Sequence, residues 1–115
     1  MRKSPLVTLK KQAEFANVRK NGKSAAMPLF VVYSIRNNLG FNRLGLSVSK
    51  KVGNAVVRNR IRRLVREYCR LNLCTNGEKP DYTDFLVIAR AAAREATFLA
   101  VGKTLEKLFK RLGIT

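Results

Sequence analysis

The residues with the most evident chemical capacity lie in one basic stretch, residues 50–70, which reads KKVGNAVVRNRIRRLVREYCR. Eight of its side chains are Lys or Arg, and Glu67 is its one acid. Arg58, Arg62 and Arg66 stand four residues apart, where like charges on a helix repel by about 0.2–0.5 kcal/mol per pair. The guanidinium fork also suits two-point binding of a phosphate. The spacing therefore favours a surface that binds nucleic acid over a face that serves only solubility.

A helix from Asn54 to Leu71 is predicted to position these charges. Asn54 is a favourable N-cap because its side-chain oxygen can accept a hydrogen bond from a backbone N–H of the first turn. At about 100° per residue, this helix separates an apolar face from an arginine-rich face. Arg60 is the exception among the arginines, because it falls beside the apolar face. That face is predicted to consist of Val57, Ile61, Leu64 and Tyr68, flanked by Val65 and Leu71.

The sequence contains no catalytic constellation. It has no histidine, and histidine is the commonest general base and metal ligand. Asp81 and Asp84 could share a metal ion, but their context, KPDYTDF, is more typical of a turn leading into a strand. Cys69 and Cys74 lack the further ligands of a zinc site and are expected to be free thiols. We therefore expect neither catalytic residues nor metal ligands on this chain.

The chain is strongly basic, with 24 Lys and Arg against seven Asp and Glu and a net charge of +17 in 115 residues. Such a charge attracts polyanions, so the candidate partners are nucleic acid and acidic membrane. No apolar run approaches the roughly 20 residues of a membrane-spanning helix, and the N-terminal MRKSPLVTLKK lacks the apolar run of a signal peptide. With 46% hydrophobic residues, residues 1–115 are expected to form one cytoplasmic domain with no membrane partner.

The N-terminal part is expected to hold a flexible basic tail, residues 1–7, followed by a helix over residues 8–20 that Thr8 caps. Phe15 falls about 100° from the small apolar side of this helix. It is therefore either a core residue of a helix packed on two sides or a partly exposed aromatic with a function, and the pattern leaves both open. The small apolar side is predicted to consist of Leu9, Ala13 and Ala16.

Three later segments, rich in β-branched and aromatic residues or alternating in polarity, are predicted to be strands: residues 29–36, 43–49 and 85–90. Turn residues at 37–42 predict a hairpin between the first two strands. The run FLVIAR at 85–90 is typical of a central strand. A polar loop at 72–82 and a final helix at 97–112 complete an α+β domain. If strands 43–49 and 85–90 are parallel neighbours, the basic helix is their crossover, and the general rule makes it right-handed.

Between Leu9 and Leu112 the chain resembles the bacterial ribonuclease P protein subunit. The resemblance rests on GLSVSKKVGNAVVRNRIRRLVRE, with the Arg58-Asn59-Arg60 motif at its centre, and on the weaker LKKQAEFANVRKNG and DFLVIAR. It implies an αβββαβα order with three helices and a sheet of about four strands, the first within residues 22–27. It also implies a left-handed crossover through the basic helix, against the general rule.

The resemblance further implies that a large RNA performs the chemistry, with bound Mg²⁺ activating water against a phosphodiester of precursor tRNA. This chain would bind that RNA and the single-stranded 5′ leader of the substrate, with no protein partner implied. Arg19 stands where the family often has a second aromatic, so charge and guanidinium stacking would share the work of holding the leader. The implied leader cleft is lined by Phe15, Val31, Tyr33, Arg19 and Arg66. The implied RNA-contacting set is Lys50, Lys51, Asn54, Arg58, Asn59, Arg60, Arg62 and Arg63.

Three other readings remain at this point. A ribosomal or other structural RNA-binding protein would share the charge and the absence of catalytic residues. A DNA-binding module could use the basic helix for recognition, although a helix-turn-helix needs a preceding helix and a short turn. A self-sufficient nuclease would need a base or metal ligands that the sequence lacks. For Arg60, the alternative to RNA contact is a stem that covers the edge of the core, or an internal ion pair.

Overall fold

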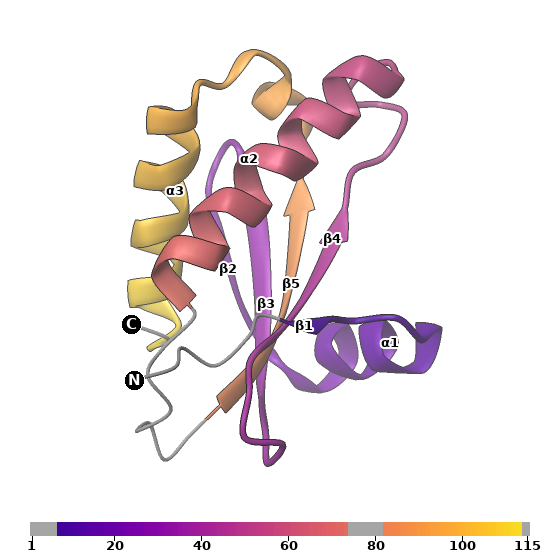
Figure 1. Ribbon diagram of the computed structural model, residues 1–115, viewed down its shortest axis with the longest axis vertical. Coiled ribbons are helices and arrows are strands. Elements are labelled where there is room, and N and C mark those ends of the chain that lie inside the picture. Colours follow the sequence, from indigo (N-terminus) through magenta and orange to yellow (C-terminus); the bar gives the residue numbers. More distant parts are fainter. Residues whose placement is uncertain (1–6, 74–81, 114–115) are drawn as a thin grey trace.

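The computed structural model describes residues 7–73 and 82–113 (Figure 1). Within these residues, three helices and five strands make up an α+β domain, with a 3₁₀ helix before the last helix. In chain order the elements are β1 (Val7–Thr8), α1 (Gln12–Asn21), β2 (Lys23–Ala26), β3 (Phe30–Asn37), β4 (Arg43–Ser47), α2 (Ala55–Leu73), β5 (Tyr82–Ala89), the 3₁₀ helix η1 (Ala91–Glu95) and α3 (Phe98–Arg111).

The strands form one mixed sheet in the order β1-β4-β5-β3-β2. β4 runs parallel to β5 and to β1, whereas β3 is antiparallel to both β5 and β2. The basic helix α2 is therefore the crossover between parallel neighbours β4 and β5. In Figure 1, α2 lies in front of the sheet and β5 stands to the left of β4 at its upper end, which makes the crossover left-handed. The general right-handed expectation is wrong here, and the hand implied by the resemblance is confirmed.

Alternating side chains of the strands fill two separate cores. Phe30 and Val32 of β3, with Phe85 and Val87 of β5, belong to the larger core beneath α2 and α3. The opposite face carries a smaller cluster in which Leu86 of β5 packs with residues at and before α1. The sheet thus separates α1 on one face from α2 and α3 on the other, as three layers.

The N-terminal expectation is wrong in part, because Val7–Thr8 forms an edge strand and α1 begins only at Gln12. The backbone N–H groups of Val7 and Leu9 donate to Asn42 and Leu44, at 3.1 and 2.9 Å, which adds this segment to the parallel side of the sheet. The cap residue of α1 is Lys11, not Thr8. The sheet consequently has five strands instead of about four. Residues 1–6 of the predicted tail lie outside the described residues.

The later start of α1 also reverses the predicted apolar side. Ala13 and Ala16 face solvent, whereas Val18 is fully buried and Phe15 is half-buried against the sheet. Leu9 is buried as well, but from the segment before the helix. The prediction failed because Leu9 precedes α1, so Leu9 does not share a helical face with Ala13 and Ala16.

The predicted hairpin between β3 and β4 is not formed, because β5 lies between these two strands. β5 is the most buried strand of the sheet, as the apolar run FLVI indicated, and a strand buried on both faces must be central. The predicted bounds of the loop at 72–82 are also wrong at both ends. α2 continues to Leu73, whose carbonyl accepts from the buried Asn42 side chain at 2.7 Å, and β5 already begins at Tyr82. Residues 74–81 lie outside the described part.

Candidate nucleic-acid interface

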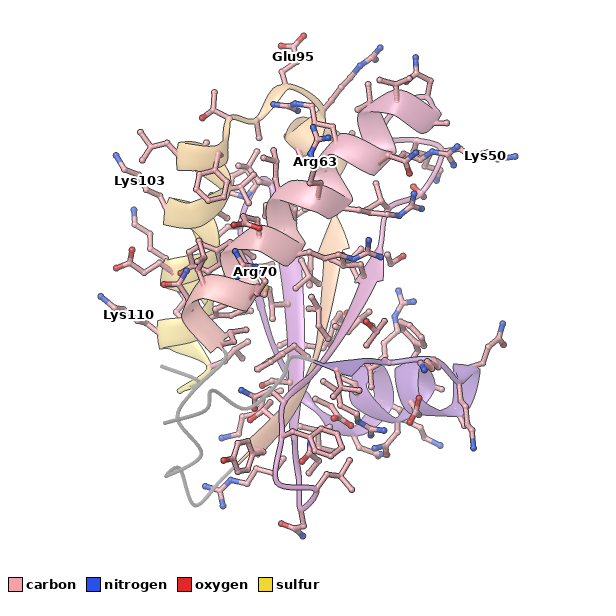
Figure 2. All side chains as sticks on the ribbon, viewed as in Figure 1. Lys50, Arg63, Arg70, Glu95, Lys103 and Lys110 are labelled. Atoms are coloured by element: carbon pink, nitrogen blue, oxygen red, sulfur yellow. The ribbon has the colours of Figure 1, made fainter. Side chains whose placement is uncertain are left out.

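The N-terminal end of α2 is built as the sequence predicted. The Oδ1 atom of Asn54 accepts the backbone N–H of Val57 at 3.0 Å, which confirms the N-cap. Before it, a turn closed by the bond from Val52 N–H to Ser49 O, 3.1 Å long, presents Lys50 and Lys51 to solvent. Figure 2 shows Lys50 pointing outward at this turn. Two lysines and the first-turn amides therefore face the same region of solvent, and both attract anions.

The buried side of α2 lies closer to the arginines than the sequence indicated. Four residues, spaced by four, are fully buried, while Val57, Leu64 and Tyr68 only flank them and Leu71 is 49% exposed. The placement of Leu71 beside the core was therefore wrong. The centre of this buried row of side chains lies at the same angle around the helix axis as Arg58, so Arg58 is half-buried. The row consists of Ile61, Val65, Cys69 and Leu73.

The predicted RNA-contacting residues of α2 fall into an exposed group and a half-buried group. Figure 2 shows Arg63 and Arg70 on the side of α2 that is turned away from the sheet. Asn59 and Arg63 are exposed, whereas Arg58 and Arg62 stand half-buried at the border of the core. The Nη1 atom of Arg62 donates to Asn59 Oδ1 at 2.9 Å, which fixes the two side chains relative to each other.

Arg60 has a structural partner. Its Nη2 atom donates to the backbone carbonyl of Ala96, which lies between η1 and α3. The bond ties α2 to the segment between η1 and α3, and Arg60 is half-buried beside it. This geometry matches the alternative in which Arg60 supports the core edge, so its assignment to RNA contact is the weakest of the set.

The acidic side chains of the described residues leave the arginines of the α2 N-terminal half unneutralised. Within residues 7–73 and 82–113, Arg43 forms ion pairs with Glu14 and Asp84. The other ion pairs in these ranges join Glu67 to Arg70 on α2 and Glu106 to Lys110 on α3. None of these pairs includes a basic residue between positions 50 and 66. In the same part of the chain, the buried Nε of Arg58 has no hydrogen-bond partner. Positive charge is therefore concentrated at this end of α2 and free to bind an external anion.

The opposite face of the sheet carries Phe15 in a seat made by a glycine. A Cβ atom placed on Gly45 of β4 would lie 2.6 Å from Cε1 of Phe15 and 2.9 Å from Cδ1 of Leu9. Only a residue without a side chain lets the ring lie so close to the strand. Tyr33 belongs to the same half-buried cluster. Since Gly45 and Tyr33 pair with Leu86 from its two sides, the Phe15 seat on β4 and Tyr33 on β3 flank the central strand β5 on one surface.

The remaining predicted leader residues are distributed around this surface. Val31 lies one register row further along, paired with Ile88, and both are half-buried on the α1 side. Arg19 is exposed one turn after Phe15 on α1. Arg66 is different, because α2 packs on the other face of the sheet, so the structure does not bring it onto the surface shared by Phe15 and Tyr33.

Sequence reasoning missed residues on both sides of this surface. Leu86 and Ile88 could have been found from the alternation within FLVIAR, since they share one face of β5. Gly45 carried no such signal, because the ring that it seats lies 30 positions earlier in the chain. An ion-pair network at one end of the surface was missed for the same reason. It joins Glu14, Arg43, Asp84 and Asn37 across four elements.

Arg43 is the centre of this network. Its Nε and Nη2 atoms donate to Asp84 Oδ1 and Oδ2 at 2.7 and 2.6 Å, and its Nη1 donates to Glu14 Oε2. The hydrogen bonds to Asp84 raise the pKa of the Arg43 guanidinium. The backbone N–H of Lys11, followed by that of Lys10, lowers the pKa of Glu14. Both groups are therefore ionised at neutral pH, and the ion pairs hold.

The described residues contain no group of three or more His, Cys, Asp or Glu side chains that could hold a metal ion. Both oxygens of Asp84 already accept from Arg43, while Asp81 lies outside the described part. Cys69 is a buried, reduced cysteine outside any disulfide, as predicted, and Cys74 lies outside the described residues too. No helix in the described part of the chain is both long and apolar enough to span a membrane.

A shallow pocket of about 610 Å³ lies at one end of the sheet, where the segment before β3 meets the segment after β5. It contains none of the predicted leader or RNA-contacting residues. The lining residues are Ala26, Met27, Pro28, Arg90, Ala91 and Ala92.

The basic helix itself is not part of a helix-turn-helix. α2 follows β4 and leads to β5, with parallel strands on both sides of it in the chain. A recognition helix of that motif follows another helix across a short turn. α2 therefore does not meet the helix-turn-helix form of the DNA-binding interpretation.

Comparison with known proteins gives one consistent result. The family model named Ribonuclease P matches residues 4–113. The ribonuclease P protein component of Clostridioides difficile (strain 630) is 45% identical over 107 residues, which cover 93% of this chain and 92% of that protein. The RNase P protein of Staphylococcus aureus has a similar structure, with a TM-score of 0.83 at 38% identity over 96% of this chain and 98% of that one. The RNase P protein of Thermotoga maritima has a TM-score of 0.77 at 34% identity, over 90% of this chain and 96% of that one.

Proposed function

Because the chain belongs to the ribonuclease P protein family, we propose that it binds the RNA subunit of that ribonucleoprotein through α2 and its preceding turn, and the 5′ leader of precursor tRNA through the α1 side of the sheet. As the protein component of a tRNA-processing enzyme, it has an RNA partner by membership of the family. The ribosomal alternative and the self-sufficient nuclease are set aside on that ground. The assignment of each surface to one part of the RNA is the proposal.

The observation that carries the proposal is the unpaired positive charge at the N-terminal end of α2. Lys50, Lys51 and Arg63 are exposed, and no described carboxylate pairs with any of them. Phosphate groups neutralise such charges and release condensed counterions, which makes the binding strongly dependent on salt. The spread of these residues over the turn and the first three turns of α2 suits several adjacent phosphates of a folded RNA.

The α1 side of the sheet suits a single strand better than a duplex. Phe15 and Tyr33 offer half-buried aromatic rings, on which unpaired bases can stack for about 1–3 kcal/mol per base. Arg19 stands one helical turn from Phe15 and offers charge and a planar guanidinium beside the rings. Val31 and Ile88 extend the apolar surface by one register row. The leader would therefore run from the rings of Phe15 and Tyr33 along β3 toward Val31.

We assign the chemistry to the RNA subunit. In the proposed mechanism the RNA and the substrate would hold Mg²⁺, and the ion would supply the activation of a water molecule for attack on the phosphodiester. The described carboxylates do not fit a Mg²⁺ site, because no three of them group together with His or Cys or with one another. Glu14 and Asp84 are engaged by Arg43, and Glu14 also by backbone N–H groups. The chain's own residues bind and orient RNA. We place this activity in the cytoplasm.

The α2 assignment is tested by titrating RNA-subunit binding against salt. With about six to eight phosphates neutralised, the slope of log K against log salt is expected to be roughly −5 to −7. Arg63→Ala should flatten the slope by about one unit. Lys103→Ala is the matched control, because it removes the same charge from an exposed position on α3 and should leave the slope unchanged. Equal slopes for Arg63→Ala and the wild type would contradict the assignment.

A second arm tests the assembled enzyme. Adding this chain to the RNA subunit at low Mg²⁺ should stimulate the cleavage of precursor tRNA, because the bound basic side chains neutralise part of the phosphate charge that metal ions would otherwise neutralise. A protein that binds the RNA subunit but leaves cleavage at low Mg²⁺ unchanged would not be acting as proposed.

A further inference from the structure

The ion-pair network around Arg43 links three elements that are distant in the chain. Arg43 lies on β4, Asp84 on β5 and Glu14 on α1. The guanidinium grips both oxygens of Asp84 and donates its remaining terminal nitrogen to Glu14. Such a planar fork fixes orientation as well as distance, which a lysine in its place would not do.

The network is fixed to the sheet and shielded from water. The side chain of Asp84 is 3% exposed, against 19% for Arg43 and 23% for Glu14. Asp84 Oδ1 also accepts from Nδ2 of Asn37 at 2.7 Å, which connects it to the end of β3. The exposed pair of Lys110 with Glu106, whose side chains are 66% and 57% exposed, has none of these supports. Arg43 therefore presents a rigid point of attachment to α1.

Glu14 is attached at both of its oxygens. Oε1 accepts the backbone N–H groups of Lys10 and Lys11, each at 2.9 Å, and thereby caps the start of α1. Oε2 accepts from Arg43. One carboxylate thus defines where α1 begins and where its first turn lies on the sheet.

The network lies one register row from the seat of Phe15. Arg43 pairs with Asp84 and Gly45 with Leu86, so the two rows are separated by about 7 Å along the strands. Glu14 and Phe15 are consecutive on α1. A helix held at Glu14 by Arg43 and closely packed at Phe15 against Gly45 cannot slide or turn without breaking one of the two contacts.

We infer that Arg43, through Asp84 and Glu14, is a positioning residue for single-stranded RNA, because it holds α1 so that the Phe15 ring lies on the same stacking surface as Tyr33, across β5 from it. The inference rests on the proposed function, since it assumes that these rings stack on leader bases. Arg43 and Glu14 do not themselves contact the leader; they act through the placement of Phe15.

The variant that separates this role from capping is Glu14→Gln. The glutamine oxygen can still accept the two backbone N–H groups of the cap. Its amide group, however, presents N–H donors to the donors of Arg43, so the tie to β4 is lost. Glu106→Gln is the matched control, because it removes an exposed pair on α3 that is distant from the stacking surface.

The measurement is the affinity of the reconstituted complex for precursor tRNA relative to mature tRNA, in a double-mutant cycle with Phe15→Ala. Glu14→Gln is expected to lower that ratio by about two- to tenfold, the lower part of the range of coupling between neighbouring residues. In the Phe15→Ala background the same substitution should have no further effect on the ratio. Glu106→Gln should change nothing in either background.

A purely structural role would give another pattern. Loss of precursor and mature tRNA binding together, or an equal loss of the ratio in both backgrounds, would overturn the inference, as would an unchanged ratio in the folded Glu14→Gln protein. If thermal melts show that Glu14→Gln is not folded, Arg43→Lys repeats the cycle, because lysine keeps a charge beside Asp84 and cannot reach both carboxylates in the same geometry. If Phe15→Ala alone leaves the ratio unchanged, the leader assignment fails first and the inference falls with it.

Discussion

Replacing Gly45 by alanine adds one methyl group beneath the Phe15 ring. The new carbon would lie 2.6 Å from Phe15 Cε1 and 2.9 Å from Leu9 Cδ1, well inside van der Waals contact at about 3.5–4.0 Å between carbon atoms. The terminal methyl of Leu9 can rotate away. The ring is part of a rigid side chain between helix and sheet, so α1 must move outward or Phe15 must leave its rotamer.

The expected cost follows from two opposing effects. Overpacking of this kind typically destabilises by about 1–3 kcal/mol, while replacing glycine by alanine within a strand recovers about 0.5–1 kcal/mol of backbone entropy. Gly45 does not have a positive φ, so alanine meets no backbone strain there. We expect a net loss of about 1–2 kcal/mol in the free energy of unfolding, or about 4–8 °C in Tm for each kcal/mol.

The assay is urea unfolding of Gly45→Ala in the wild-type and the Phe15→Ala backgrounds. Without the ring, the added methyl group has room, so Gly45→Ala should become neutral or stabilising. Gly102→Ala on α3 is the control, because its Cβ would lie at an ordinary 3.4 Å from Tyr68 Cδ2. This substitution should stabilise the helix by up to about 1 kcal/mol. A Gly45→Ala protein as stable as the wild type with Phe15 in place would refute the tight seat of the ring.

Three further outcomes are expected. Asn54→Ala should lower the stability by about 0.5–2 kcal/mol through loss of the α2 cap, as measured by chemical denaturation. Arg60→Gln should cost about 1–2 kcal/mol through the lost bond to Ala96, while RNA-subunit affinity of the folded variant stays within about twofold; a large selective loss of affinity would return Arg60 to the RNA-contacting set. The N–H of Lys11 keeps the folded-state pKa of Glu14 below its ordinary 4.5. The ionised Glu14 carboxylate therefore contributes fully to the free energy of unfolding above pH 4.5, and this contribution is lost as the pH falls through the lowered folded-state pKa. Stability of Glu14→Gln should therefore fall less steeply on acidification than that of the wild type, and parallel curves would contradict this.

The sequence predicted the elements whose signals are local. Asn54, the alternation of Leu44 and Leu46, and the apolar run of β5 each carry information within a few residues, and the structure places them as predicted. The charge of α2 was also readable, because it depends on residue type and spacing alone. From the sequence, the parallel pairing of β4 with β5 was only a condition, and the structure meets that condition.

The features that were missed depend on contacts between distant positions. β1 has only two residues, too few for a periodic pattern, and its place is set by hydrogen bonds to Asn42 and Leu44. The turn residues at 37–42 favoured a hairpin, yet insertion of the more apolar β5 prevails because it buries both of its faces. The seat of Phe15 on Gly45 and the attachment of Glu14 to Arg43 join positions about 30 residues apart, and only the fold brings them together.

The most direct test of the account is the affinity of the reconstituted complex for precursor tRNAs with leaders of increasing length, compared with mature tRNA. The account predicts that this chain raises the affinity for leader-bearing substrates selectively, and that Phe15→Ala removes about 1–3 kcal/mol of that gain per lost stack, a factor of about five to more than a hundred. Mature tRNA affinity should hardly change in the same variant. A folded Phe15→Ala protein that binds the long-leader substrate as tightly as the wild type would contradict the leader surface.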